Sequence, residues 1–146
     1  MPWRTIAAEA ERESPLWGDA LRDESEPEAV FSALADQRYA LGLETIYEGY
    51  LVHYGTSRLF DPQDPDVAVL LGDYLYAHGL VRIAELGDVE VIGELAELIS
   101  RCAYLRAEGA PGDGEVWADT AERLSGRGAR SSARKDALAA HGRLVG

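Results

Sequence analysis

Carboxylate and imidazole side chains in the first half of the chain are the groups whose spacing could support metal chemistry. Glu44 and Glu48 lie four residues apart and would share one face of a helix, and His53 follows five residues later. Iron sites in helical bundles use Glu-x-x-His pairs on two helices, and this sequence contains no such pair. We therefore interpret Glu44 and Glu48 as part of a solvent-exposed acidic face.

A second acidic group follows at Asp61, Asp64 and Asp66. The spacing of the first two suits one face of a helix, but Pro62 and Pro65 make a helix across all three improbable. Asp64 before Pro65 is instead typical of an N-cap followed by a proline in the first turn. We expect a helix start here, and no metal site.

Other catalytic classes lack their characteristic patterns. The sequence shows no nucleophile arrangement around serine or cysteine, no phosphate-binding glycine loop and no Cys–His zinc spacing. Cys102 is the single cysteine, which excludes an intrachain disulfide and favours a reducing compartment. The first residues lack the pattern of a signal peptide, and the longest apolar run, Val67 to Leu71, is too short for a membrane span. We expect a cytoplasmic protein with no membrane span.

Charge is unevenly distributed along the 146 residues. The net charge is −12, but residues 123–146 carry six bases and one acid, whereas residues 1–122 carry eight bases and 25 acids. An acidic body repels phosphate backbones, so we expect no nucleic-acid partner. We predict a single helical domain over residues 1–124 and a basic, flexible tail over residues 125–146, with a terminal helix over 134–144 as its only structure.

The apolar periodicity is helical throughout and predicts an all-α bundle of about five to six helices. We expect a short first helix around residues 3–10, and a helix that starts at Ser25–Glu28 and buries Phe31 and Tyr39. Gly42 either ends that helix or marks a tight crossing. The apolar set from Leu43 to Tyr54 follows at once, so we expect one long, bent helix or two near-collinear ones that end before Gly55. Residues 65–86 are apolar on most sides, which favours a central helix. Gly87 and Asp88 predict a cap and the start of the next helix, whose apolar stripe runs from Val91 to Leu105.

The segment from Leu70 to Asp88 carries a resemblance to a known family. It contains Gly72-Asp73-Tyr74-Leu75 and closes on Leu86-Gly87-Asp88, and Leu95 to Ser100 follows. These residues resemble the trans-prenyl diphosphate synthases, or polyprenyl synthetases, in which a Gly-Asp-(Phe/Tyr)-Leu segment opens a core helix. The resemblance covers residues 43–105 and implies part of the isoprenoid synthase fold.

The chain departs from that family at its metal motif. The resemblance implies an Asp-Asp-x-x-Asp motif on the preceding helix, where this sequence has His53 and Tyr54. Neither residue supplies the oxygen ligands that magnesium requires. The chain is thus similar to the non-catalytic component I of hexaprenyl and heptaprenyl diphosphate synthases. That similarity implies a small subunit that packs on a catalytic large subunit and influences product chain length, with Mg²⁺ only in the partner and no cofactor of its own.

The expected contact or pocket residues lie on the two helices with most of the tyrosines. Asp73 should pair with Arg38 or Arg58, because an ionised carboxylate on an apolar helix needs a partner, and His78 should be a hydrogen-bonded core histidine. Two alternatives stay open: a homodimeric helical scaffold or adaptor, and a module that holds an isoprenoid or other lipid in an apolar pocket. The full candidate set is Tyr50, Asp73, Tyr74, Tyr76 and His78.

Overall fold

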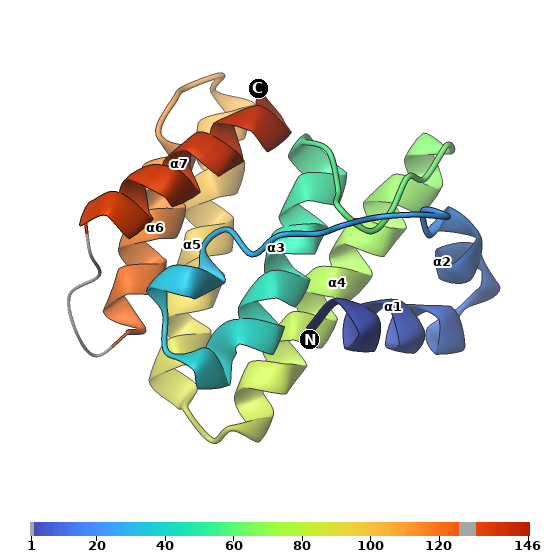
Figure 1. The fold of residues 1–146 in the computed structure, drawn as a ribbon, viewed down its shortest axis with the longest axis horizontal. Coiled ribbons are helices and arrows are strands. Elements are labelled where there is room, and N and C mark those ends of the chain that lie inside the picture. Colours follow the sequence, from blue (N-terminus) through green and yellow to red (C-terminus); the bar gives the residue numbers. More distant parts are fainter. Residues whose placement is uncertain (1, 126–130) are drawn as a thin grey trace.

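The computed structural model describes residues 2–125 and 131–146, and within these ranges the fold is all-α (Figure 1). The prediction of an all-α bundle is confirmed, and the one β-type pairing among the described residues is an isolated bridge between Leu21 and Phe60. The α-helices are Pro2–Glu13 (α1), Pro15–Ala20 (α2), Ala40–Tyr54 (α3), Pro65–Glu85 (α4), Val89–Ala107 (α5), Asp113–Arg123 (α6) and Ser131–Val145 (α7). Two 3₁₀ turns, Ser32–Leu34 (η1) and Gln37–Tyr39 (η2), precede α3.

Helix α3 is the centre of the molecule (Figure 1). An unbroken run of ten of its residues, Gly42 to Leu51, is buried. Helix α4, which we expected to be central, lies at the outside, with Leu70 and Val81 more than half exposed. The prediction was wrong because apolar residues on all sides of a helix only make burial on all sides possible. They do not show that other elements pack against every side.

Glycines bring α3 and α4 into close contact. Gly42 and Gly49 on α3 are seven residues apart, as are Gly72 and Gly79 on α4, so each pair lies on one helix face. A Cβ at Gly49 would lie 2.9 Å from the carbonyl oxygen of Gly72, and a Cβ at Gly79 would overlap the side chain of Ile46. The expected tight crossing at Gly42 is therefore present.

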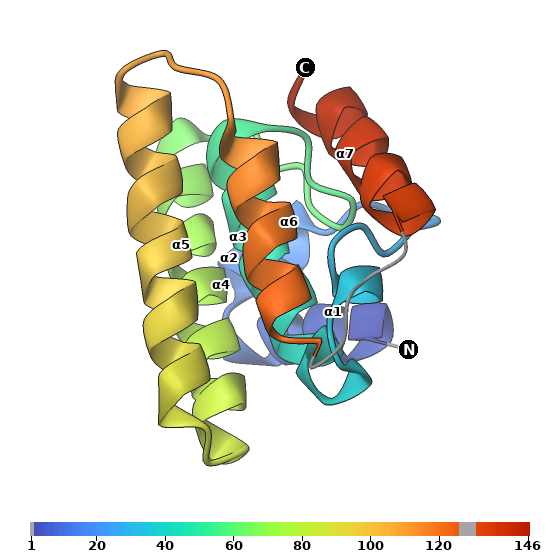
Figure 2. The ribbon, with the colours of Figure 1, turned by 90° about the vertical axis from the view of Figure 1, so that its left-hand side faces the viewer.

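Two apolar clusters lie on either side of this helix pair. The larger one surrounds Tyr47, Leu95 and Trp117 and joins α3 to α5 and α6. The smaller one contains Trp3 and Trp17 of the N-terminal helices and packs them against Leu75 of α4. Figure 2 shows the two sides, with α5, α6 and α7 in front and α1 behind.

The chain between α2 and α3 differs from its prediction. Instead of a helix from Ser25, the segment is irregular as far as Phe31 and then forms η1 and η2. It crosses the front of the bundle in Figure 1, and Phe31 and Leu34 are buried there. Tertiary contacts of these side chains replace the helix that the local capping signal favoured.

Capping predictions around α4 and α5 are confirmed. The Asp64 carboxylate accepts a hydrogen bond from the backbone N–H of Asp66 at 2.8 Å, and the Asp88 carboxylate accepts one from Val91 at 3.3 Å. Gly87 between the helices has φ +80°, a conformation that glycine adopts without a Cβ penalty. These contacts set the turn that joins α4 to α5.

Part of the expected C-terminal tail is a packed helix. Ala137 and His141 of α7 are buried, and Arg134 forms ion pairs of 2.9 Å with Asp119 and Glu122 of α6. The basic charge of this segment therefore pairs with acids of the body. Residues 126–130 of the predicted tail lie outside the described residues.

Candidate functional site

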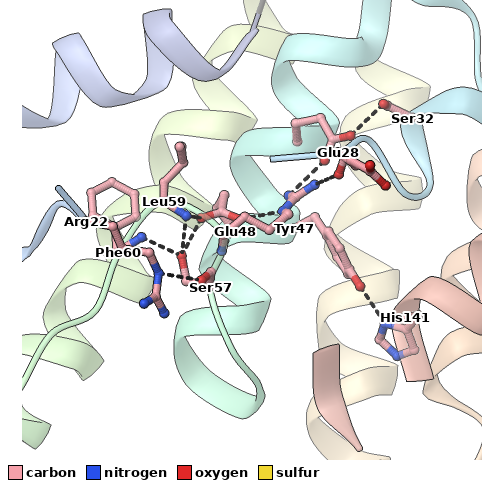
Figure 3. A network of polar contacts seen from close by, with 11 residues as sticks. Arg22, Glu28, Ser32, Tyr47, Glu48, Ser57, Leu59, Phe60 and His141 are labelled. Carbon is pink, nitrogen blue, oxygen red and sulfur yellow. Dashed lines mark hydrogen bonds and ion pairs between the residues drawn. The ribbon is translucent and has the colours of Figure 1, made fainter. Parts of the chain in front are cut away.

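Glu44 and Glu48 form a buried ionic network with Arg58. Figure 3 shows the polar contacts around Glu48. The guanidinium Nε of Arg58 donates to Glu48 Oε2 at 2.7 Å, and Nη2 lies 2.9 Å from Glu44 Oε1. Both carboxylate side chains are 1% exposed or less. The predicted solvent-exposed acidic face is wrong, because a cation ten residues beyond Glu48 neutralises both acids inside the protein.

The loop that follows α3 wraps around the Glu48 carboxylate. The hydroxyl of Ser57 donates to Glu48, as do the backbone N–H groups of Arg58 at 3.3 Å and Leu59 at 3.1 Å. Arg22 secures the same loop by donating to the carbonyl oxygen of Ser57 at 3.1 Å. Each lone-pair region of Glu48 thus faces a donor from the chain itself.

Glu44 has fewer donors. Ser32 of η1 donates its hydroxyl to Glu44 Oε2 at 2.6 Å, and Arg58 approaches from the other side. Burial raises the pKa of Glu44, and the attraction of Arg58 opposes that rise. For Arg58, burial acts to lower the pKa, but the two nearby carboxylates outweigh it and raise the pKa. Both acids are committed to internal contacts.

A second polar cluster joins α3 to the C-terminal helices. The Asp113 carboxylate accepts from Tyr50 at 2.5 Å and Arg106 at 2.7 Å, and lies 3.0 Å from His141 Nε2. The other ring nitrogen of His141 lies 2.7 Å from the hydroxyl of Tyr47 (Figure 3). Burial acts to raise the pKa of Asp113, but hydrogen bonds from His141, Tyr50 and Arg106 outweigh it and hold the pKa below its usual range. The cluster ties α7 to the core.

The five candidate residues do not come together at one place. Tyr50 is 1% exposed and lies in the core. Tyr74 and His78 face the N-terminal helices: Tyr74 stacks on Trp17 with ring centroids 5.9 Å apart, and His78 Nε2 lies 2.9 Å from Glu9. Tyr76 is partly buried against the larger cluster. These residues therefore belong to separate surroundings within the fold.

Two of these residues differ from their expected roles. Asp73 is 66% exposed and pairs with His53 at 3.2 Å, not with Arg38 or Arg58. The sequence missed this partner because α3 and α4 run antiparallel at close range, which brings His53 over Gly72. His78 is hydrogen-bonded, as expected, through its contact with Glu9, but its side chain is about one-third exposed and so lies outside the core.

Helix α4 carries exposed apolar side chains. Val69, Leu70 and Val81 are each 51–55% exposed. By length and composition α4 is also the one described helix that could cross a membrane, with 28% of its most apolar window buried. Core helices of soluble proteins pass the same test, so that finding carries little weight.

Within residues 2–125 and 131–146, no three His, Cys, Asp or Glu side chains are arranged to hold a metal ion. Comparison of the chain with protein-family models, with curated proteins and with solved structures finds no match.

Proposed function

We propose that this protein is a non-catalytic small subunit of a heteromeric polyprenyl diphosphate synthase. It docks on a catalytic large subunit and influences the length of the product. The observation that carries the proposal is the uncovered apolar face of α4, the helix that contains the Gly72-Asp73-Tyr74-Leu75 segment. Leu70, Ala77 and Val81 lie along one side of α4 by helical spacing and are all exposed, and an exposed apolar patch is typical of an interaction site.

The interior of α3 supports a structural role over a catalytic one. Its two acids, Glu44 and Glu48, are paired with Arg58 and hydrogen-bonded on their remaining sides. Carboxylates that bind Mg²⁺ must present free oxygens to the ion and its bound diphosphate. In this proposal the magnesium and the chemistry belong to the large subunit.

An influence on product length would come from the position of α4 in the complex. Tyr50 and Tyr74 are packed within the chain, so they do not themselves wall a tunnel in a partner. Tyr50 joins α3 to Arg106 of α5 and Asp113 of α6 instead, and Tyr74 joins α4 to Trp17 of α2. The partner would meet the outer side of α4, where Leu70 and Val81 project.

Reconstitution tests this function. The full chain is mixed with a polyprenyl synthase from the same organism that carries both aspartate-rich motifs. Binding is measured by calorimetry, and Mg²⁺-dependent elongation by product length. We expect a stable complex and a product distribution that differs from that of the synthase alone. Elongation by the isolated chain, or products unchanged by a saturating amount of it, would overturn the proposal.

A matched pair of variants tests whether the synthase binds to α4. Val81→Asp places a charge on the exposed face and should weaken the complex at least tenfold, because desolvating an unpaired carboxylate is costly. Ala139→Asp adds the same charge at an exposed position of α7 and should leave binding unchanged. Equal losses from both variants would count against α4 as the contact. A symmetric dimer that ignores the synthase would instead favour the scaffold alternative.

A further inference from the structure

Helices α4 and α5 are neighbours, and each carries exposed apolar residues along one side. Helical spacing places Leu70, Ala77 and Val81 on one face of α4, and Val89, Gly93 and Ala96 on one face of α5, and all six are exposed. We name these six residues the hairpin face. The two helices lie side by side along one side of the molecule (Figure 2). With 19 and 21 residues they are about 30 Å long, which is the scale of a specific protein interface.

Acidic residues border the hairpin face. Arg101 is the exposed base on these two helices, since Arg82 pairs with Glu9 and Arg106 with Asp113. Asp73 lies 3.2 Å from His53 Nε2, and its side chain remains two-thirds exposed. The exposed acids on the two helices are Asp66, Asp73, Glu85, Glu90 and Glu97. The apolar surface therefore has a strongly negative rim.

We propose that the hairpin face binds a different protein that presents an apolar helical surface bordered by Lys and Arg side chains. A second copy of this chain would bring the same patch against itself, and its acidic rim would face an acidic rim. Like charges that face each other across an interface weaken binding by several kcal/mol and slow association. The negative rim also repels an anionic lipid surface. This inference depends on the proposed function only for the partner's identity as a synthase.

Photocrosslinking in cells that produce the protein tests the inference without assuming the partner. The full chain carries benzoylphenylalanine at one position, Ala77 or Ala96 on the hairpin face, or Ala139 on α7 as the control; all three are exposed. We expect an adduct with one distinct polypeptide from Ala77 and Ala96 and none from Ala139. An adduct at twice the 15.9 kDa of the chain, or no adduct, would overturn the inference.

Charge reversal makes the test specific for the acidic rim. Asp73→Lys with Glu97→Lys should lower the adduct yield from Ala77 about tenfold. Glu11→Lys with Asp19→Lys changes the net charge equally on α1 and α2 and should leave the yield unchanged. Equal yields in the two double variants would overturn the inference. An adduct that responds to the rim but contains a partner without aspartate-rich motifs would sustain the inference and overturn the proposed function.

Anionic vesicles test whether the hairpin face binds a lipid surface instead of a protein. The full chain is sedimented with phosphatidylglycerol vesicles at low salt, and we expect it to stay in the supernatant. Co-sedimentation that Val81→Asp abolishes would overturn the inference in favour of a lipid surface.

Discussion

Arg58 is the residue on which the charge balance of the interior depends. It pairs with two buried acids, donates to the carbonyl oxygen of Glu28 at 2.8 Å, and lies 4.4 Å from the ring centroid of Trp3. It therefore joins α3, the irregular segment before η1, and α1. Removing one charge of such a buried network destabilises the fold, because the remaining charges stay buried without an opposite charge.

The first prediction concerns this network. Arg58→Leu should lower the free energy of unfolding by about 3–5 kcal/mol, because two carboxylates are left buried without a cation. Chemical denaturation measures the change. Adding Glu44→Gln and Glu48→Gln should recover part of the loss, since the uncompensated charges are gone. Arg22→Leu, at an arginine whose side chain is 30% exposed, is the control and should cost less. Equal losses for Arg58→Leu and Arg22→Leu would contradict the prediction.

Asp113 gives a prediction about pH. Its native pKa lies below the usual value of 3.8, so the native state binds protons less readily than the unfolded state. The stabilisation is present above pH 3.8 and is lost as the pH falls through the native pKa. Asp113→Asn should cost about 1.5–3 kcal/mol at pH 7 and flatten the acid limb of the stability profile. Glu115→Gln on the same helix, at an exposed position, should do neither. An unchanged acid limb in Asp113→Asn would contradict this account.

At the scale of elements, the close packing of α3 against α4 depends on glycines, which have no side chain at the contact. Glycines at matching seven-residue intervals let the two backbones approach closely: a Cβ at Gly49 would lie 2.9 Å from the carbonyl oxygen of Gly72, and a Cβ at Gly79 would lie 3.1 Å from that of Gly42. The same spacing that leaves α3 fully enclosed leaves the far side of α4 without a neighbour. The close crossing and the exposed hairpin face are thus two results of one arrangement.

A glycine pair separates packing from helix propensity. Gly79→Ala should destabilise the protein by about 1–3 kcal/mol, because the new methyl group overlaps Ile46 in a packed interior. Gly93→Ala in α5 meets nothing within 4 Å and should stabilise by about 0.5–1 kcal/mol through helix propensity alone. Thermal unfolding of the two variants measures both effects. Stability changes of the same sign in both variants would show that α3 and α4 are not in close contact at Gly79.

At the scale of the whole molecule, one helix pair unites two apolar clusters. Trp3 and Trp17 belong to the smaller cluster and Trp117 to the larger one, and α3 and α4 contribute to both sides. Arg58 also touches both, since it lies near Trp3 and near the Tyr47 ring at 5.0 Å. The clusters should therefore unfold together.

Tryptophan fluorescence tests this cooperativity. In variants that keep one tryptophan each, the denaturation curves of Trp3, Trp17 and Trp117 are each compared with the far-ultraviolet circular dichroism of the same variant. We expect the two probes to give one midpoint in every variant, because a two-state domain loses all its packing at once. A Trp3 signal that changes before the helical signal would show that α1 unfolds independently.

Local features of the chain were predictable from the sequence. The caps at Asp64 and Asp88, the turn at Gly87 and the buried stripe of Val91, Leu95 and Cys102 on α5 follow the predicted pattern. Each depends on residues within one or two helical turns, which sequence periodicity reports directly. The all-α class follows from the same signals.

The candidate site was decided by contacts between distant segments. The sequence could not show that Glu44 and Glu48 are buried, because their cation, Arg58, comes from a loop after the helix ends. The run of buried apolar neighbours such as Ile46 and Tyr47 was the one available signal. Helical spacing records which residues share a face, whereas burial of that face depends on which other elements pack against it. Only the tertiary structure could therefore place α3 inside and leave the hairpin face exposed.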